Sequence, residues 1–232
     1  MHVLIAGGSR GIGLACSRLY AAKGWDVSVI YNNTPVPDEY GICSYKCDVS
    51  DPDQVKATVK AITDKNGTID SLVYCSGIAL TGLATDFTTD NYRKIIDTNF
   101  GGLFFITHEV IPYMVRNHKG TITAISSMWG QTGASCESLY SASKGAVDAY
   151  IKSLAKELGP SDIRVNAVSP GVVDTDMMKE YTDEDKEALK DETPLGKIGT
   201  PEEIANVVYY LSSDSSSFIT GQIIGVNGGF LI

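Results

Sequence analysis

A tyrosine and a lysine that could move a proton stand four residues apart, at Tyr140 and Lys144, and Ser127 lies thirteen residues before the tyrosine. Positions i and i+4 of a helix share one face, so the Lys144 ammonium is expected to lie close to the Tyr140 phenol. A neighbouring positive charge favours the ionised phenol and should lower the pKa of Tyr140 from about 10 toward the working pH. Such a phenol can donate or accept a proton, so the spacing predicts general acid–base chemistry at Tyr140.

The first residues run into a glycine-rich turn, with Gly7, Gly11 and Gly13 spaced as Gly-x-x-x-Gly-x-Gly. Small residues let the backbone approach a pyrophosphate, and a helix that follows offers free N–H groups and the positive end of its dipole. The spacing differs from the Gly-x-Gly-x-x-Gly fingerprint, and a tight structural turn is the alternative. The turn therefore indicates a nucleotide phosphate site only together with the chemistry predicted downstream.

Apolar, β-branched runs alternate along the chain with segments of helical periodicity, which predicts βαβ units and a parallel sheet buried on both faces. A length of 232 residues suits one α/β domain. We expect a single-domain, Rossmann-like, doubly wound parallel sheet flanked by helices. The expected strands are 3–6, 26–31, 42–46, 71–75, 121–126, 164–168 and 222–226. The expected helices start near residue 11, cover 52–66, 91–117 and 201–212, and include one that holds Tyr140 and ends at Gly159-Pro160.

Composition disfavours several classes of function. The formal net charge of −9 argues against nucleic-acid binding, which needs a basic surface. No apolar run is long enough to cross a bilayer and the first residues do not resemble a signal peptide, so we expect no membrane association and a cytoplasmic location. The three histidines form no pattern with Ser127 that would predict a Ser-His-Asp hydrolase. The five cysteines lack metal-ligand spacing, so we expect no metal site and buried, free thiols.

Several features resemble, in order and spacing, the short-chain dehydrogenase/reductase family: the glycine turn, Asn99, Ser127, Tyr140-x-x-x-Lys144 and Pro170-Gly171. The resemblance covers essentially the whole chain. Within the family, segments 169–177 and 220–229 are most similar to the β-ketoacyl (3-oxoacyl) carrier-protein reductases. The resemblance implies an NADPH-dependent oxidoreductase that reduces a ketone to a secondary alcohol. It also implies that residues 1–232 form one domain, with an NADP-binding N-terminal half and a catalytic, substrate-binding C-terminal half.

The resemblance implies a role for each catalytic match. Tyr140 would be the general acid that protonates the carbonyl oxygen while a hydride arrives from the nicotinamide. Ser127, expected at the carboxyl end of a strand, would hydrogen-bond and polarise that oxygen. Lys144 would hold the ribose hydroxyls of the nicotinamide and depress the pKa of the tyrosine. Asn99 would anchor a water that connects Lys144 to solvent, with an ordinary helix amide as the alternative.

The other matches are expected to line the cofactor site. Asp48 and Val49 would border the adenine, and Val173 and Thr175 would contact the carboxamide or the phosphates. For Asp48, an aspartate that caps a turn or a helix is the alternative. The expected set, besides Tyr140 and Lys144, is Gly7, Ser9, Arg10, Gly11, Ile12, Gly13, Tyr31, Asn32, Asp48, Val49, Ser76, Gly77, Pro170, Gly171, Val173 and Thr175.

The residues after the second expected strand indicate which nucleotide binds. An acidic residue there would accept the ribose hydroxyls and repel the 2′-phosphate of NADP. This chain has Tyr31, followed by Asn32 and Asn33, and Arg10 in the glycine turn is placed to pair with that phosphate. We therefore expect NADP(H), with a surface arginine as the alternative for Arg10.

One segment departs from the family pattern. Where the family usually has Asn-Asn-Ala-Gly after the fourth strand, this chain has Tyr74-Cys75-Ser76-Gly77. Much of the contact of that motif is made by backbone, so cofactor binding should persist. The asparagine hydrogen bonds are lost, which leaves open how the segment is held rigid.

The acidity of the segment after Pro170-Gly171 bears on the substrate. Residues 174–192 carry nine carboxylates against three lysines, for which a solvated helix face is the simplest explanation. Acyl carrier proteins are acidic and would be repelled by an acidic entrance, which would favour a cationic substrate instead. Two positions where carrier-protein reductases often have arginine are His118 and Ser161 here, although Lys119 is adjacent.

Segment 126–137 resembles reductases of a 5-aminopentanone group on a lysine of translation elongation factor P. That substrate carries a free amine, and Trp129 and Glu137 would line its site, with core packing and a surface charge as their alternatives. The ketone could thus be a small molecule, or be tethered to acyl carrier protein or to elongation factor P. A non-catalytic NADP sensor or a scaffold is disfavoured by the intact Ser127, Tyr140 and Lys144.

Assembly is expected only by analogy, as a homotetramer or homodimer. Apolar residues that suit such contacts, and suit an internal core equally, are Phe100, Leu103, Phe104, Ile106 and the terminal 230–232.

Overall fold

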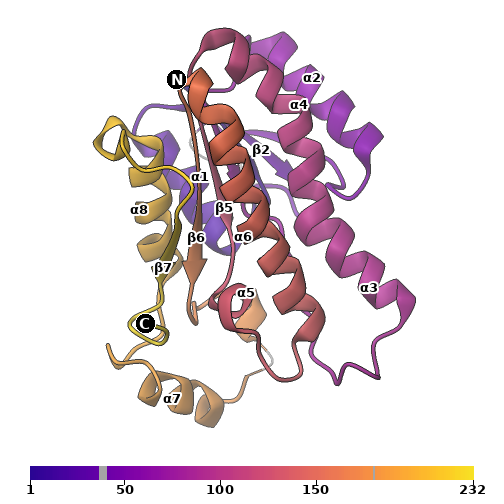
Figure 1. Cartoon of the computed structure of the whole chain (residues 1–232), viewed down its shortest axis with the longest axis vertical. Coiled ribbons are helices and arrows are strands. Elements are labelled where there is room, and N and C mark those ends of the chain that lie inside the picture. Colours follow the sequence, from indigo (N-terminus) through magenta and orange to yellow (C-terminus); the bar gives the residue numbers. More distant parts are fainter. Residues whose placement is uncertain (37–40, 180) are drawn as a thin grey trace.

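A seven-stranded parallel sheet forms the centre of the molecule (Figure 1). The computed structural model describes residues 1–36, 41–179 and 181–232. The strands lie in the order β3-β2-β1-β4-β5-β6-β7. Their bounds are β1 (His2–Ala6), β2 (Asp26–Tyr31), β3 (Cys43–Lys46), β4 (Ser71–Tyr74), β5 (Gly120–Ile125), β6 (Ile163–Pro170) and β7 (Ile223–Val226). The predicted Rossmann-like fold is confirmed, and chain order reverses between β1 and β4, where such sheets bind ligands.

Helices cover both faces of the sheet (Figure 1). The α-helices are α1 (Gly11–Ala22), α2 (Pro52–Asn66), α3 (Thr89–Ile96), α4 (Gly102–Asn117), α5 (Met128–Thr132), α6 (Ser138–Leu158), α7 (Asp183–Asp191) and α8 (Pro201–Ser212). Helices α2, α4 and α6 pack on one face, and α1 and α8 pack on the other. Figure 1 shows α5 and α7 near the end of the sheet toward which β6 and β7 point.

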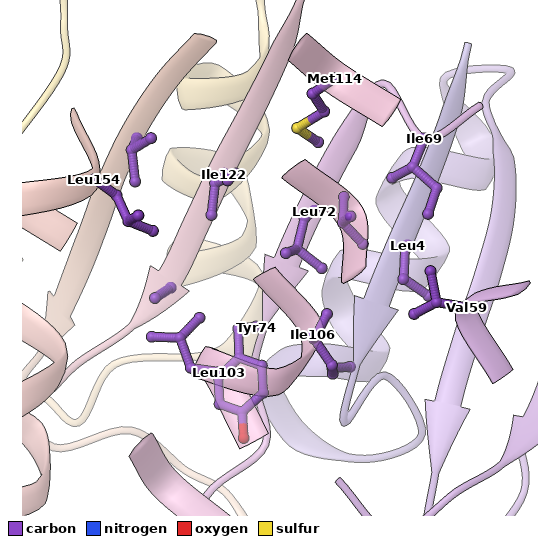
Figure 2. Close-up of a cluster of buried hydrophobic side chains, with 14 of the residues drawn as sticks. Leu4, Val59, Ile69, Leu72, Tyr74, Leu103, Ile106, Met114, Ile122 and Leu154 are labelled. Carbon is purple, nitrogen blue, oxygen red and sulfur yellow. The ribbon is translucent and has the colours of Figure 1, made fainter. Parts of the chain in front are cut away.

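Each face of the sheet has its own apolar core, which explains the continuous hydrophobic runs of the central strands. Figure 2 shows the first core, where Leu4, Leu72 and Ile122 of neighbouring strands meet side chains from the covering helices. Ile106 and Met114 of α4 are fully buried there. Burying one such side chain stabilises the fold by about 1.5–3 kcal/mol, so the strand ends that carry the polar residues are held on a rigid support.

The segment predicted as one helix over 91–117 is divided. A π-helical turn, η1 (Asp97–Gly101), lies between α3 and α4, and the N–H of Gly102 donates to the carbonyl of Asp97. A π turn accommodates one more residue than an α turn, and no change in the apolar pattern marks it in the sequence. The short helices α5 and α7 were not predicted as elements. Three 3₁₀ turns complete the described structure: η2 (Gly159–Ser161), η3 (Asp176–Met178) and η4 (Asp214–Ser216).

The cysteines are free, as predicted, but burial was overestimated. Cys16 and Cys47 are buried, whereas Cys43, Cys75 and Cys136 are only partly buried because they lie at strand ends or in loops. Among residues 1–36, 41–179 and 181–232, no helix is both long and apolar enough to span a membrane. In the same residues no group of three or more metal-binding side chains is positioned to hold an ion.

Candidate active site

Residues from distant parts of the sequence meet at the carboxyl edge of the sheet, because all strands are parallel and end at that edge. Most of the predicted site residues lie at these strand ends or in the loops after them. In chain order, Gly7 follows β1, Tyr31 ends β2, Asp48 follows β3, Ser76 follows β4, Ser127 follows β5 and Pro170 ends β6.

Ser127 and Tyr140 are brought together at the end of β5. Ser127 is the N-cap of α5, and its Oγ accepts a hydrogen bond from the Trp129 N–H over 3.2 Å. Tyr140 lies in the first turn of α6, and its phenol is close enough to the Ser127 side chain for the serine hydroxyl to lower the pKa of the tyrosine. The two hydroxyls that the sequence predicted to act on one oxygen atom are therefore neighbours.

Burial nevertheless raises the pKa of Tyr140 to about 12, and the Glu137 carboxylate adds to this rise. The expectation that Lys144 lowers this pKa is wrong for the observed arrangement. The Lys144 Nζ lies 5.7 Å from the centre of the Tyr140 ring, and desolvation of the phenol dominates over any influence of the ammonium. Tyr140 is thus protonated at neutral pH, which is the form required of a general acid.

Lys144 is buried beneath this pair. Its Nζ donates to the carbonyl oxygen of Ile125 over 2.8 Å, and burial lowers its pKa to about 8. The carboxylate of Asp148 opposes that lowering. A Cβ added to Gly77 would lie 3.3 Å from the Nζ, so only a very small residue at position 77 leaves the ammonium room.

Asn99, in the π-helical turn, links the loop after β4 to the helix that carries Tyr140. Its Oδ1 accepts from the Ile78 N–H over 2.8 Å, and its Nδ2 donates to the Ile78 carbonyl over 2.9 Å. The same Nδ2 donates over 2.9 Å to Ser143 Oγ, which in turn donates to the Tyr140 carbonyl over 2.7 Å. Asn99 is fully buried and far more constrained than an ordinary helix amide. Its role as a water anchor stays a prediction.

Sequence reasoning missed the contribution of two residues near Asn99. One is Ser143, which bridges Asn99 and Tyr140, and for which the sequence offered no signal beyond its place beside Lys144. The other is Tyr74, whose hydroxyl donates to the carbonyl of Thr98 over 2.5 Å. The sequence signal for Tyr74 was its departure from the Asn-Asn-Ala-Gly pattern of the family. The hydrogen bond of Tyr74 to Thr98 holds this segment in place of the lost asparagine hydrogen bonds.

The glycine turn forms a cradle without side chains. Gly7 has φ of +77°, and a Cβ there would lie 2.7 Å from the Ser76 nitrogen. A Cβ on Gly13 would lie 2.1 Å from the carbonyl oxygen of Gly7. The first N–H groups of α1 receive no side-chain cap from Arg10, and the first helical turn has no acidic residue. This donor set fits a pyrophosphate, which would accept the free N–H groups at the positive end of the helix dipole.

Arg10 reaches across to the segment after β6. Its Nη1 lies 2.9 Å from Asp176 Oδ2, and Lys179 Nζ lies 2.7 Å from the other oxygen of that carboxylate. The side chains of Arg10 and Asp176 are 62% and 41% exposed. Beside this pair is a cavity of about 340 Å³, lined by Gly11, Asp174, Thr175, Asp176, Met178, Lys179 and Lys186.

Asp48 has the structural role that was its alternative. Its Oδ1 accepts from the Ser50 N–H over 2.9 Å and from the Ser50 hydroxyl over 2.7 Å, which shapes the turn before α2. The helix itself is capped by Asp51. Contacts of Asp48 and Val49 with adenine stay predictions. At the end of β2, Tyr31 is partly buried and Asn32 is exposed.

Glu137 is a half-buried carboxylate whose charge reaches the Tyr140 phenol. Burial raises the pKa of Glu137. Burial also raises the pKa of Tyr181, in the acidic segment, and the charge of Glu137 adds to that rise. No hydrogen bond or ion pair of this carboxylate is found in the part of the chain that the structure describes. The ring centre of Trp129 lies 5.8 Å from that of Phe230, in an edge-to-face arrangement. The C-terminal residues therefore pack against α5. Glu180, one of the nine predicted carboxylates, lies outside the described residues.

Comparisons with known proteins agree with this geometry. Residues 6–231 match the family profile described as "Enoyl-(Acyl carrier protein) reductase". A 3-oxoacyl-[acyl-carrier-protein] reductase of Thermotoga maritima is 37% identical, covering 99% of this chain and 97% of the relative. The chain belongs to the short-chain dehydrogenase/reductase family. Members of this family use nicotinamide cofactors. An oxidoreductase of Bacillus subtilis called uncharacterized, YmfI, is 40% identical over 98% of this chain and 97% of its own length.

Solved short-chain dehydrogenase/reductase structures share the whole fold. The ligand-free aldohexose dehydrogenase of Thermoplasma acidophilum is 33% identical with a TM-score of 0.93, covering 99% of this chain and 93% of that one. A structure of ElxO with NADP bound is 30% identical with a TM-score of 0.92, covering 99% and 98%. The protein is thus an oxidoreductase of this family that resembles the 3-oxoacyl reductases.

Proposed function

We propose that the protein is an NADPH-dependent ketone reductase in which Ser127, Tyr140, Lys144 and Asn99 form the catalytic set. The observation that carries this proposal is that Ser127, which caps α5 after β5, and Tyr140, in the first turn of α6, lie close together at the carboxyl edge of the sheet, near enough for Ser127 to lower the pKa of Tyr140. NADPH, when bound, supplies a hydride to the carbonyl carbon.

The residues of the chain supply the proton and the polar surroundings. Tyr140 is protonated at neutral pH, since its pKa is raised to about 12, and it donates that proton to the carbonyl oxygen. Ser127 hydrogen-bonds the same oxygen and polarises the carbonyl group. The carbonyl group gains one hydride and one proton and becomes a secondary alcohol. The tyrosinate that remains regains a proton from solvent, and Lys144 would hold the ribose hydroxyls of the nicotinamide.

We propose NADP(H) rather than NAD(H) because of the charges around the adenosine end of the cradle. Arg10 is exposed enough to exchange its partner Asp176 for a 2′-phosphate. Tyr31 and Asn32 place no carboxylate at the end of β2. The residues proposed to hold the dinucleotide are the set predicted from the sequence, in the N-terminal half of residues 1–232 and in segment 170–175.

A β-ketoacyl thioester is the first candidate substrate, by similarity to the relatives named for 3-oxoacyl-[acyl-carrier-protein]. The test is an NADPH-consumption assay with acetoacetyl thioesters, small ketones and wild-type enzyme, with Tyr140→Phe as the control. Turnover should collapse in the variant while NADPH binding persists. If nucleotide binding persists but neither protein turns over any ketone, an NADP-sensing protein is the better description.

A ketone that carries an amine is the second candidate, and the specific observation in its favour is Glu137. A half-buried carboxylate without a partner costs free energy. A cationic group on the substrate would form an ion pair with it. The 5-aminopentanone group on a lysine of elongation factor P has this chemistry. Comparing that modified factor with acetoacetyl thioesters at equal concentration decides between the two candidates. A strong preference for the thioester would remove the second.

We further propose a cytoplasmic homotetramer or homodimer. Leu103 and Ile106 are fully buried in the core, so they cannot serve a subunit contact. Phe104 is 43% exposed and forms an aromatic group with Phe100 and Tyr150. Such an exposed aromatic group suits a subunit contact. Light scattering after size-exclusion chromatography of the wild type and of Phe104→Glu tests this assembly.

A further inference from the structure

Tyr74, the last residue of β4, places a hydroxyl at the edge of the apolar core. Tyr74 is 1% exposed and packs with Leu103 and neighbouring core residues (Figure 2). The hydroxyl donates to the Thr98 carbonyl over 2.5 Å. Burial and the nearby negative charge of Asp48 raise the pKa of Tyr74, so the hydroxyl remains a donor at any working pH.

The acceptor of this bond lies in the π-helical turn, one residue before Asn99. The turn departs from the α-helical register on either side, and a return to that register would rotate later residues by roughly 100° per residue of shift. Gly102 makes the contact possible. A Cβ at that position would lie only 2.3 Å from the Tyr74 hydroxyl oxygen. The Tyr74 hydroxyl can therefore reach the turn only because residue 102 is glycine. The position of the turn in turn depends on that hydrogen bond.

The segment that begins at Tyr74 makes a second contact with the π-helical turn, through the side chain of Asn99. Four residues after Tyr74, Ile78 offers its N–H and its carbonyl to the Asn99 amide, at 2.8 and 2.9 Å. The end of β4 thus fixes the backbone before Asn99 through Tyr74, and the loop after β4 fixes the side chain of Asn99 through Ile78. From there the chain of bonds continues through Ser143 to the carbonyl of Tyr140.

We propose that the Tyr74 hydroxyl is a positioning group for the reaction, which holds the π-helical turn so that the Asn99 amide faces Ile78, Ser143 and the space beside Lys144. The inference rests on the proposed function, in which Asn99 belongs to the catalytic set. Without the hydroxyl, the Thr98 carbonyl loses a buried donor and the turn loses its tie to β4.

The experiment compares Tyr74→Phe with a matched control, Tyr20→Phe. Tyr20 is also fully buried, and its hydroxyl bonds Ser212 over 2.6 Å, between α1 and the end of α8. Both variants are assayed at a temperature where thermal melts show them folded. In Tyr74→Phe we expect kcat for ketone reduction to fall about tenfold and KM for NADPH to stay within about twofold, since only the catalytic geometry is disturbed. Tyr20→Phe should leave kcat unchanged.

Two further measurements separate positioning from plain stability. Amide hydrogen exchange of residues 97–103 should accelerate in Tyr74→Phe, by about tenfold or more, and not in Tyr20→Phe. In an Asn99→Ala background, Tyr74→Phe should cause no further loss of kcat, because the hydroxyl acts through Asn99. If Tyr74→Phe does not fold, Gly102→Ala, whose added Cβ displaces the hydroxyl, is measured in its place.

Two outcomes would overturn the inference: equal loss of stability in both tyrosine variants with unchanged kcat and exchange, or full additivity with Asn99→Ala. Failure of the proposed function looks different. In that case the wild type reduces none of the ketones, while the exchange of residues 97–103 still reports whether Tyr74 holds the turn.

Discussion

The ammonium group of Lys144 donates a hydrogen bond to the carbonyl oxygen of Ile125 over 2.8 Å. Ile125 is the last residue of β5, and Ser127 follows two residues later. The bond therefore ties the helix that carries Tyr140 to the strand end that carries Ser127. Because the contact is buried and one partner is ionised, it is stronger than an ordinary surface hydrogen bond. Lys144 thus helps to set the geometry of the Ser127–Tyr140 pair.

Replacing Tyr140 with phenylalanine should remove the proton donor and leave the fold intact. We expect kcat to fall by about 10²–10⁴-fold, the usual contribution of a positioned acid. Tyr113→Phe is the control, because that tyrosine accepts a hydrogen bond from Thr63, away from the site, and should keep full activity. Kinetics with NADPH and a ketone, with nucleotide binding followed by fluorescence, provide the measurement. Equal activity of the two variants would show that Tyr140 is not the acid.

Activity should decline as the pH rises through about 8. Burial lowers the pKa of Lys144 to about 8, so its positive charge is lost above that pH, while Tyr140, with a pKa raised to about 12, stays protonated. The pH profile of kcat/KM for NADPH reports groups of the free enzyme. The wild-type profile should bend near pH 8, and Lys144→Met should show low activity without that bend. A wild-type plateau extending to pH 10 would contradict this assignment.

The titration of Lys144 should also change the stability of the fold, which should rise with pH where activity declines. The pKa of Lys144 is lowered from 10.5 to about 8 in the folded protein, so between these values the unfolded chain binds more protons. The free energy of unfolding therefore rises with pH in this window. Urea denaturation of the wild type should show a gain relative to Lys144→Met between pH 8 and 10, where folded Tyr140 does not titrate. No relative gain would indicate that Lys144 keeps an ordinary pKa.

Arg10→Ala should weaken NADPH binding and leave NADH binding nearly unchanged. A charged hydrogen bond to a phosphate contributes about 1.5–3 kcal/mol, so Kd for NADPH should rise by about 10- to 100-fold. Asp176→Asn is the matched variant, because it weakens the competing ion pair of Arg10 and should tighten NADPH binding. Titration calorimetry with both nucleotides measures the effect. Equal losses for NADPH and NADH would mean that Arg10 does not contact the 2′-phosphate.

The sequence predicted the parts of the structure that depend on local pattern. Alternating apolar runs located the strands, and the spacing of Ser127, Tyr140 and Lys144 predicted that these side chains lie near one another, because both depend on regular strand and helix geometry. The π-helical turn at Asn99 left no mark on the apolar pattern. The partner of Arg10 lies 166 residues away, and the pKa of Tyr140 depends on burial that only the folded chain creates. Such properties arise from tertiary contacts and cannot be obtained from spacing.

Glu137→Gln should reveal whether the enzyme prefers a cationic substrate. The carboxylate lies close enough to Tyr140 and Tyr181 to raise the pKa of both, so a positive group on a bound ketone would meet it near the reacting carbonyl. A ketone with a terminal trimethylammonium group and its neutral tert-butyl analogue have almost the same shape. The ratio of their kcat/KM values isolates the charge.

In the wild type this ratio should favour the cation, and in Glu137→Gln it should fall by about tenfold, which corresponds to about 1.4 kcal/mol of lost transition-state stabilisation. Asp183→Asn, at the exposed start of α7, removes one negative charge farther along the acidic segment and should leave the ratio nearly unchanged. A wild-type ratio near one, or an equal fall in both variants, would show that Glu137 does not select the substrate and would leave the neutral thioester as the better candidate.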